Sequence, residues 1–138
     1  MRLPFFGHNE RVIQKAVDVL TSGGLIIYPT DTVYALGCAS HHAKALEKLA
    51  KVKHAKRTKP PVSLVCASIS QAAGYTGQMD NTNFRLLKTY FPGPYTFVLP
   101  VKQKLPKALG KRDSIGIRVP KHEGICALIE ALGQPMAS

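Results

Sequence analysis

The amino-acid sequence predicts one α/β domain, in which a twisted mixed sheet carries helices on both faces. A chain of 138 residues is the length of a single domain with a moderate core, so residues 1–138 are taken as one unit. Apolar residues recur at helical spacing in some segments and form short runs, several rich in β-branched residues, in others. The resulting order, α-β-α-β-α-α-β-β-α, is too irregular for a simple doubly wound parallel sheet.

The first half of the chain shows two helices and one strand. The first helix is expected to begin after Asn9, which can cap it, and to end at Gly23. Its inward face consists of Val12, Ile13, Ala16, Val17 and Leu20. The apolar run Leu25–Tyr28 predicts a buried strand that ends before a proline. Ser40 is expected to cap a second helix that runs to about Lys53. Its inward residues are Ala43, Leu46 and Ala50.

The second half alternates again between helices and strands. Strands are expected over Val62–Cys66, Tyr95–Leu99 and Ser114–Val119, with a further one starting after Pro135. Ser68 and Gln71 have the spacing of a capping box, and Asp80 is expected to open the next helix. The inward residues of that helix are Phe84, Leu87 and Phe91. The last helix has Ile125, Leu128, Ile129 and Leu132 inward and closes at Gly133.

Charge is the unusual feature of the composition. Nineteen Lys and Arg against eight Asp and Glu give a net charge of +11. A field of this sign attracts polyanions, so nucleotides and RNA are the natural partners, with solubility alone as the alternative. No apolar run reaches the length of a membrane span, so no membrane partner is expected. Three widely spaced cysteines without a Cys-x-x-Cys pattern are typical of a reduced, cytoplasmic protein.

Two groups of polar residues lie in or next to the predicted strands. Thr30-Asp31-Thr32 follows directly after the first strand, where ligands bind in open α/β sheets. The alternative is a turn in which these side chains bond to their own backbone. Arg118 lies within an apolar strand, and a buried arginine is paired with a carboxylate or with an anionic ligand. An internal ion pair and a ligand site therefore both remain open for Arg118.

Basic residues crowd the stretch 44–59, where Glu47 alone opposes them. They are Lys44, Lys48, Lys51, Lys53, Lys56, Arg57 and Lys59. A solvated helix face explains the first three. The last three lie in a loop broken by Pro60-Pro61, again beside the end of a strand, which makes them candidates for phosphate contacts. A second basic cluster follows at Lys102, Lys104, Lys107, Lys111 and Arg112.

Three stretches resemble, in the right order, the motifs of the YrdC-like family. They are Tyr28–Gly37, with Ala35 where the family usually has Gly, Phe91–Leu99 and Ser114–Pro120. Phe84–Lys88 and Leu132–Met136 resemble the YciO-like branch of that family. The resemblance implies the three-layer YrdC-like fold, with a basic concave cleft built from strand ends. The residues expected there are Thr30, Lys56, Thr96 and Arg118.

The resemblance also implies a function linked to tRNA modification. Threonylcarbamoyl-adenylate synthases of this family are nucleotidyltransferases that condense ATP, with Mg²⁺, L-threonine and bicarbonate, and they carry no tightly bound cofactor. By the resemblance, Arg118 holds the threonine carboxylate, and Thr30 and Thr32 contact its polar groups. Lys56, Arg57 and Ser114 fall on the nucleotide side, with Lys56 and Arg118 as the catalytic pair.

The alternative is a non-catalytic module that binds double-stranded RNA or tRNA. Its expected contacts are Lys53, Lys56, Arg57 and Lys59. Two departures from the family pattern favour it. Placing Pro61-Val62 on the family's Pro-Leu puts His54 and Lys56 at the Lys-x-Arg positions, and another register offers Lys53 and Ala55. Family members also continue into a Ser-x-Asn segment beyond Ser138, so we expect this domain to lack its C-terminal part.

Overall fold

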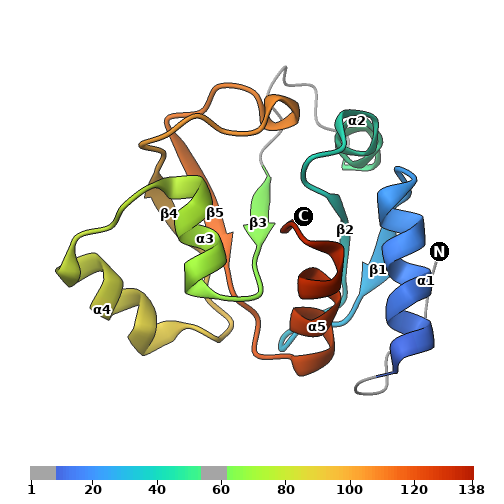
Figure 1. The fold of residues 1–138 in the computed structure, drawn as a ribbon, viewed down its shortest axis with the longest axis horizontal. Helices are drawn as coiled ribbons and strands as arrows, with labels where there is room; N and C mark the ends of the chain where they lie inside the picture. The colour runs from blue at the N-terminus through green and yellow to red at the C-terminus, as the bar shows by residue number, and fades with distance from the viewer. Residues whose placement is uncertain (1–8, 54–61) are drawn as a thin grey trace.

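A single mixed sheet organises the chain, whose computed structural model describes residues 9–53 and 62–138. Its strands lie in the order β1-β2-β6-β3-β5-β4 (Figure 1). They are β1 (Ile26–Tyr28), β2 (Ala35–Ala39), β3 (Ser63–Val65), β4 (Phe97–Pro100), β5 (Ser114–Arg118) and β6 (Met136–Ala137). β3 and β5 are parallel, and the other neighbouring strands are antiparallel. The predicted mixed sheet is therefore confirmed.

Helices cover both faces of this sheet, as the sequence predicts. They are α1 (Glu10–Thr21), α2 (Ala43–Val52), α3 (Ile69–Thr76), α4 (Asn81–Tyr90), α5 (Glu123–Leu132) and the short 3₁₀ helix η1 (Lys107–Leu109). α1 and α5 pack together over one face, on a cluster that includes Tyr28, Val65 and Met136. α2, α3, α4 and η1 contribute to the cluster on the other face.

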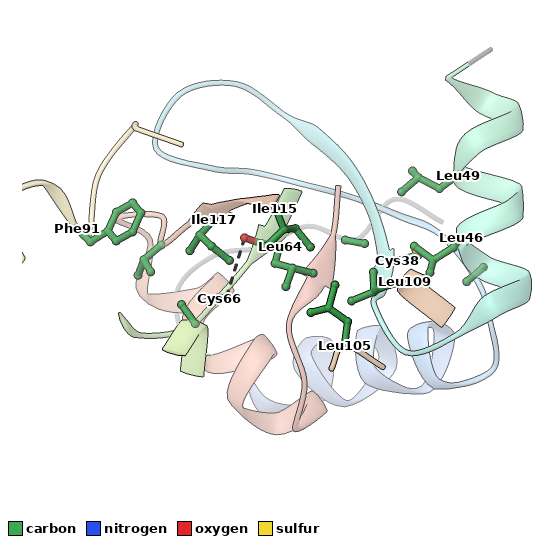
Figure 2. Packing of buried hydrophobic residues seen from close by; sticks show 14 of the residues in the cluster. Cys38, Leu46, Leu49, Leu64, Cys66, Phe91, Leu105, Leu109, Ile115 and Ile117 are labelled. Atoms are coloured by element: carbon green, nitrogen blue, oxygen red, sulfur yellow. Dashed lines mark hydrogen bonds between the residues drawn. The ribbon is translucent and has the colours of Figure 1, made fainter. Parts of the chain in front are cut away.

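The larger cluster of buried side chains lies under α2, α3 and η1. Figure 2 shows Leu46 and Leu49 of α2 near Cys38, with Leu109 of η1 close by. Leu64 and Ile117, from the two parallel strands, are fully buried in the same cluster. Each buried side chain of this size contributes about 2 kcal/mol through the removal of apolar surface from water. This cluster fixes the position of β5, which carries Arg118 at its end.

Local capping explains where several helices begin. The Asn9 side chain accepts hydrogen bonds from the backbone N–H groups of Arg11 and Val12, which confirms the first predicted cap. Ser68 Oγ accepts from Gln71 N at 3.1 Å, whereas Gln71 Oε1 accepts from Ala67 N at 2.8 Å. The capping box therefore closes one residue earlier than its usual form. At the other end of the chain, Gly133 ends α5 with a positive φ of 78°.

The second strand and the second helix differ from the sequence prediction. Ala35–Ala39 forms β2, which completes a hairpin with β1 and was not expected as a strand. α2 then begins at Ala43, and its cap is His42 rather than Ser40. The reason is that Ser40 directly follows β2 and still bonds to the segment before β6, since its backbone N–H donates to Pro135 O at 3.2 Å. The inward face of α2 turns accordingly and consists of Ala45, Leu46 and Leu49.

The expected inward face of α4 is also wrong in part. Leu87 and Phe91 are buried as predicted, but Phe84 is 42% exposed. α4 lies at one end of the molecule in Figure 1, beside α3 and away from α1. A helix at the edge of a domain needs a narrower apolar face, since fewer of its side chains meet another element.

We expect replacement of Ile117 by alanine to lower the free energy of unfolding by about 3 kcal/mol, because a fully buried side chain leaves a cavity. The matched control is Val98→Ala in the neighbouring strand β4, where the side chain is 71% exposed and the loss stays below about 1 kcal/mol. Urea unfolding of both variants measures the difference. Equal losses in the two variants would contradict the assignment of the core.

Candidate functional site

The loop of the β1–β2 hairpin is held by its own threonine hydroxyls. Thr30 Oγ1 donates to Val33 O at 2.6 Å and accepts from Thr32 N at 3.1 Å. The two threonine hydroxyl oxygens, Thr30 Oγ1 and Thr32 Oγ1, are also 3.1 Å apart. These bonds are the local turn that sequence reasoning gave as one alternative for Thr30-Asp31-Thr32. The turn leaves the side chain of Asp31 to point away from the hairpin.

Asp31 reaches across to the end of β5. Its Oδ1 accepts a hydrogen bond from Arg118 Nη2, and the two side chains form an ion pair with 13% and 17% of their surface exposed. Its Oδ2 accepts from the backbone N–H of Lys121 at 3.1 Å. Arg118 Nη2 also donates to Thr32 Oγ1 at 3.3 Å. The internal ion pair expected as one possibility for Arg118 is therefore present.

The electrostatics of this cluster favour an ionised Asp31. Burial acts to raise the pKa of Asp31, but the Lys121 backbone N–H and the Arg118 guanidinium outweigh burial and lower that pKa below its ordinary value. A carboxylate that stays charged holds the guanidinium through a charge-assisted hydrogen bond. Asp31 thus fixes the position of Arg118 at neutral pH.

Arg118 keeps donors that this pairing does not use. A guanidinium carries five N–H donors, and Asp31 and Thr32 both contact the same nitrogen, Nη2. Nε is buried and has no hydrogen-bond partner in the described part of the chain. An unsatisfied buried donor costs about 1–3 kcal/mol, and a carboxylate at the Nε edge would relieve this cost once the surrounding side chains make room for it, since Nε itself is not exposed. The arrangement is therefore suited to hold a second carboxylate.

The face of β5 that carries Arg118 lies next to exposed residues. Alternation along the strand puts Gly116 and Arg118 opposite to Ile115 and Ile117, which face the core. A side chain at Gly116 would lie 2.6 Å from Ser63 Oγ, so a glycine lets the neighbouring strand approach. Thr96, Val98 and Ser114 are exposed. Ser114 lies at the other end of β5, about 13 Å from Arg118 along the strand.

The structure brings together some of the residues that the sequence suggested. Thr30, Thr32 and Arg118 form one cluster, and Ser114 stands at the far end of the same strand. Lys53 follows α2, where its charge acts on the buried thiol of Cys38. Burial raises the pKa of that thiol to about 11 despite this charge. Lys56, Arg57 and Lys59 lie outside the described residues, so the basic concave cleft stays a prediction.

Sequence reasoning did not single out two members of the site. Asp31 was noted as part of Thr30-Asp31-Thr32, but it was not named as the partner of Arg118. The second member is the backbone N–H of Lys121, which donates to Asp31. The carboxylate of the hairpin loop could have predicted the pair, since an arginine in an apolar strand requires a negatively charged partner. A backbone donor leaves no trace in the sequence.

Residues 9–53 and 62–138 show neither a cluster of metal ligands nor a membrane-spanning helix. No three His, Cys, Asp or Glu side chains in this part of the chain are grouped so that they could hold a metal ion. None of the helices described there is long and apolar enough to cross a membrane.

Comparison with known proteins identifies the family. Residues 18–138 match the Sua5/YciO/YrdC family, whose description reads "Telomere recombination". The chain therefore belongs to this family, and the resemblance seen in its motifs is confirmed. Over 132 residues it is 40% identical to the Escherichia coli (strain K12) protein YciO, covering 94% of this chain and 63% of that protein. The chain thus spans less than two thirds of that relative.

Solved structures agree with this assignment. The crystal structure of E. coli YciO is similar with a TM-score of 0.84 and 37% identity, covering 99% of this chain and 66% of that one. The crystal structure of P. abyssi Sua5 complexed with L-threonine is similar with a TM-score of 0.83 and 29% identity, covering 99% of this chain and 39% of that one. The three-layer YrdC-like fold is therefore the fold of this chain.

We expect Asp31→Asn to lower the free energy of unfolding at pH 7 by about 1 kcal/mol, because it leaves the partly buried Arg118 charge without its partner. Since the folded state lowers the pKa of Asp31, this stabilisation is present above the ordinary carboxyl pKa. It is lost as the pH falls through the lowered pKa of the folded state, so wild type and variant converge in acid. Urea unfolding at several pH values measures this convergence.

The matched control is Asp18→Asn, which changes an exposed carboxylate on α1. It is expected to alter the free energy of unfolding by less than about 0.5 kcal/mol at any pH. A deficit of Asp31→Asn that stays the same from neutral to acid pH would show that the charge of Asp31 is not what stabilises the pair.

Proposed function

We propose that this chain binds the carboxylate of L-threonine at Arg118, in a function related to threonylcarbamoyl-adenylate formation. The observation that carries the proposal is the Arg118 guanidinium, which Asp31 orients while its Nε stays without a partner in the described structure. Thr30 and Thr32 place hydroxyl groups beside it, suited to the polar groups of a small amino acid. The L-threonine complex of the similar P. abyssi Sua5 supports the choice of amino acid.

The proposed chemistry depends on positioning and charge neutralisation. The threonine nitrogen bonds to the carbon of bicarbonate, one C–O bond breaks and water leaves, which gives a carbamate. A carbamate oxygen then bonds to the α-phosphorus of ATP, and the bond to the β-phosphate breaks, so that pyrophosphate leaves. Arg118 holds the threonine carboxylate, and the nucleotide lies toward Ser114 at the other end of β5. Lys56 and Arg57 are assigned to the phosphates, with Lys56 and Arg118 as the catalytic pair. Mg²⁺ enters with ATP as part of the substrate.

We expect Arg118→Lys to weaken L-threonine binding at least tenfold, because lysine keeps the charge but cannot form the two-pronged contact of a guanidinium. Calorimetric titration measures the dissociation constants of wild type and variant. Lys121→Gln is the matched control, since it removes a neighbouring charge while the backbone donor to Asp31 stays. Unchanged threonine affinity in Arg118→Lys would overturn the proposal.

We expect ATP and AMP to bind weakly, with little threonine-dependent exchange of pyrophosphate into ATP. The physical reason is the incomplete Lys-x-Arg pair, because His54 or Ala55 stands where a second cation is needed. An assay with labelled pyrophosphate, run with and without L-threonine and bicarbonate, measures the exchange. Exchange at ordinary enzymatic rates would show that this chain is a proficient synthase.

A second candidate function is supported by a basic cavity in the segment 101–113. The cavity has a volume of about 660 Å³, and Lys104, Lys107, Lys111 and Arg112 line it together with Asp113. Several cations against one carboxylate fit the backbone of double-stranded RNA or tRNA. In this alternative the chain is a non-catalytic RNA-binding module. Both proposals place the protein in the cytoplasm, and its three cysteines are free thiols.

We expect affinity for duplex RNA to fall steeply with salt and to depend little on sequence. Neutralising Lys56, Arg57 and Lys59 together removes up to three phosphate contacts and should flatten the slope of log affinity against log salt. The triple variant of Lys104, Lys107 and Lys111 tests the other basic segment by the same filter-binding titration. A slope that neither triple variant changes would show that RNA binding does not use these surfaces.

A further inference from the structure

A separate cavity of about 790 Å³ opens where α3 and α5 begin, on the side toward α4. The residues from Ala67 to Ile69 form one wall, and the residues that follow β5, from Val119 to Glu123, form another. α4 closes the third side with Phe84 and Lys88. Thr30, Thr32 and Arg118 do not belong to its lining in the described structure. This cavity is therefore distinct from the site proposed for threonine.

The floor of the cavity is apolar. Phe91 and Val119 are buried, with 6% and 4% of their surface exposed, and both also belong to the core. Phe84 stands at the mouth with 42% of its surface exposed, although its chemistry suits a buried position. A flat apolar group in the cavity would cover this ring, and stacking between rings adds about 0.5–1.5 kcal/mol to the burial of area.

Positive charge lies on two sides of this floor, from Lys88 and Lys121, and exceeds the single carboxylate of the described lining, Glu123. Lys88 Nζ is 5.5 Å from the centre of the Phe84 ring, so a cation–π contact keeps it near the mouth. Lys121 lines the opposite wall with an exposed side chain. A ligand that carries one anionic group on an apolar body matches this combination of two cations and an apolar floor.

We propose that this cavity binds a small amphipathic anion, a carboxylate or phosphate attached to an aromatic or aliphatic body. Its volume is within the range of small-molecule sites, about 300–1,000 Å³, and apolar walls with a few polar groups are the usual composition of such sites. Binding is non-covalent. Cys126 also lines the cavity, but its thiol donates to Pro120 O at 3.5 Å, and burial raises the pKa of that thiol.

The cavity and the threonine site share a short piece of backbone. Val119 and Pro120 line the cavity directly after Arg118, and the N–H of Lys121 holds Asp31. A movement of this backbone therefore reaches both sites, whereas Lys121→Gln changes a side chain of the cavity and keeps the backbone donor to Asp31. The test must show that a bound anion occupies the cavity and not Arg118, so it uses variants that alter each site separately.

The probe is phenyl phosphate, titrated into the ¹⁵N-labelled protein and followed by amide chemical shifts. We expect saturable binding with a dissociation constant below about 1 mM, with the largest shifts at Ser68, Ile69, His122 and Glu123. Phenol and inorganic phosphate, the two halves of the probe, are each expected to bind at least about tenfold more weakly. Benzoate, tested in parallel, distinguishes a carboxylate from a phosphate as the preferred anionic group.

Two paired sets of variants test the assignment. Lys88→Gln combined with Lys121→Gln is expected to weaken phenyl phosphate about fivefold, and Phe84→Ala by a similar factor. Lys15→Gln combined with Lys44→Gln removes the same charge from exposed helix positions and should leave the affinity unchanged. Arg118→Lys should also leave the affinity for phenyl phosphate unchanged, even where it weakens threonine binding.

Three results would overturn the proposal. One is the absence of saturable shifts with phenyl phosphate up to about 10 mM, which is far above the affinity expected for a formed site. Another is equal weakening by the two lysine pairs, which would indicate general attraction to a basic protein. The third is loss of binding in Arg118→Lys with shifts centred on the hairpin loop, which would place the anion at the other site.

Discussion

The ion pair between Asp31 and Arg118 joins two distant parts of the sheet. Asp31 belongs to the loop after β1, whereas Arg118 ends β5, and the sheet order places β2, β6 and β3 between their strands. A partly buried pair of charges contributes little to stability by itself, because desolvation offsets much of the attraction. Its effect is positional, since it holds the hydroxyls of the hairpin loop and the guanidinium together. The proposed carboxylate site depends on this contact.

Local signals in the sequence predicted much of the fold. Asn9, Ser68 and Asp80 cap helices as expected, because capping involves residues only two to three positions apart. β2 was missed, since Ala35–Ala39 has none of the β-branched residues typical of strands. It becomes a strand because β1 and β6 pair with it on both sides. The pairing with β1 is a local hairpin, but the pairing with β6 joins Cys38 to Ala137 near the end of the chain, which no local pattern reports.

The candidate site could be predicted only in its parts. The sequence predicts the threonines of the hairpin loop as site residues because they follow the end of a strand. It predicts the arginine because a charge within an apolar strand needs a partner. That Asp31 satisfies Arg118 follows from the topology, since 87 positions separate the two residues in the chain. The cavity between α3, α4 and α5 depends likewise on three segments that the fold brings together. The sequence predicts Phe84 on the inward face of its helix, but Phe84 is exposed at this cavity, because its position depends on how the three segments come together.

Asp31 holds Arg118 through Nη2, and Arg118 Nε has no partner among the described residues; in the proposed function this Nε donates to the carboxylate of the ligand. The ¹⁵N–¹H resonance of Arg118 Nε, assigned by comparison with Arg118→Lys, tests this claim most directly. We expect this resonance to shift on addition of L-threonine and to stay in place with L-threoninol, which lacks the carboxylate. An Nε resonance that does not move while L-threonine saturates the protein would show that Arg118 Nε does not hold the carboxylate.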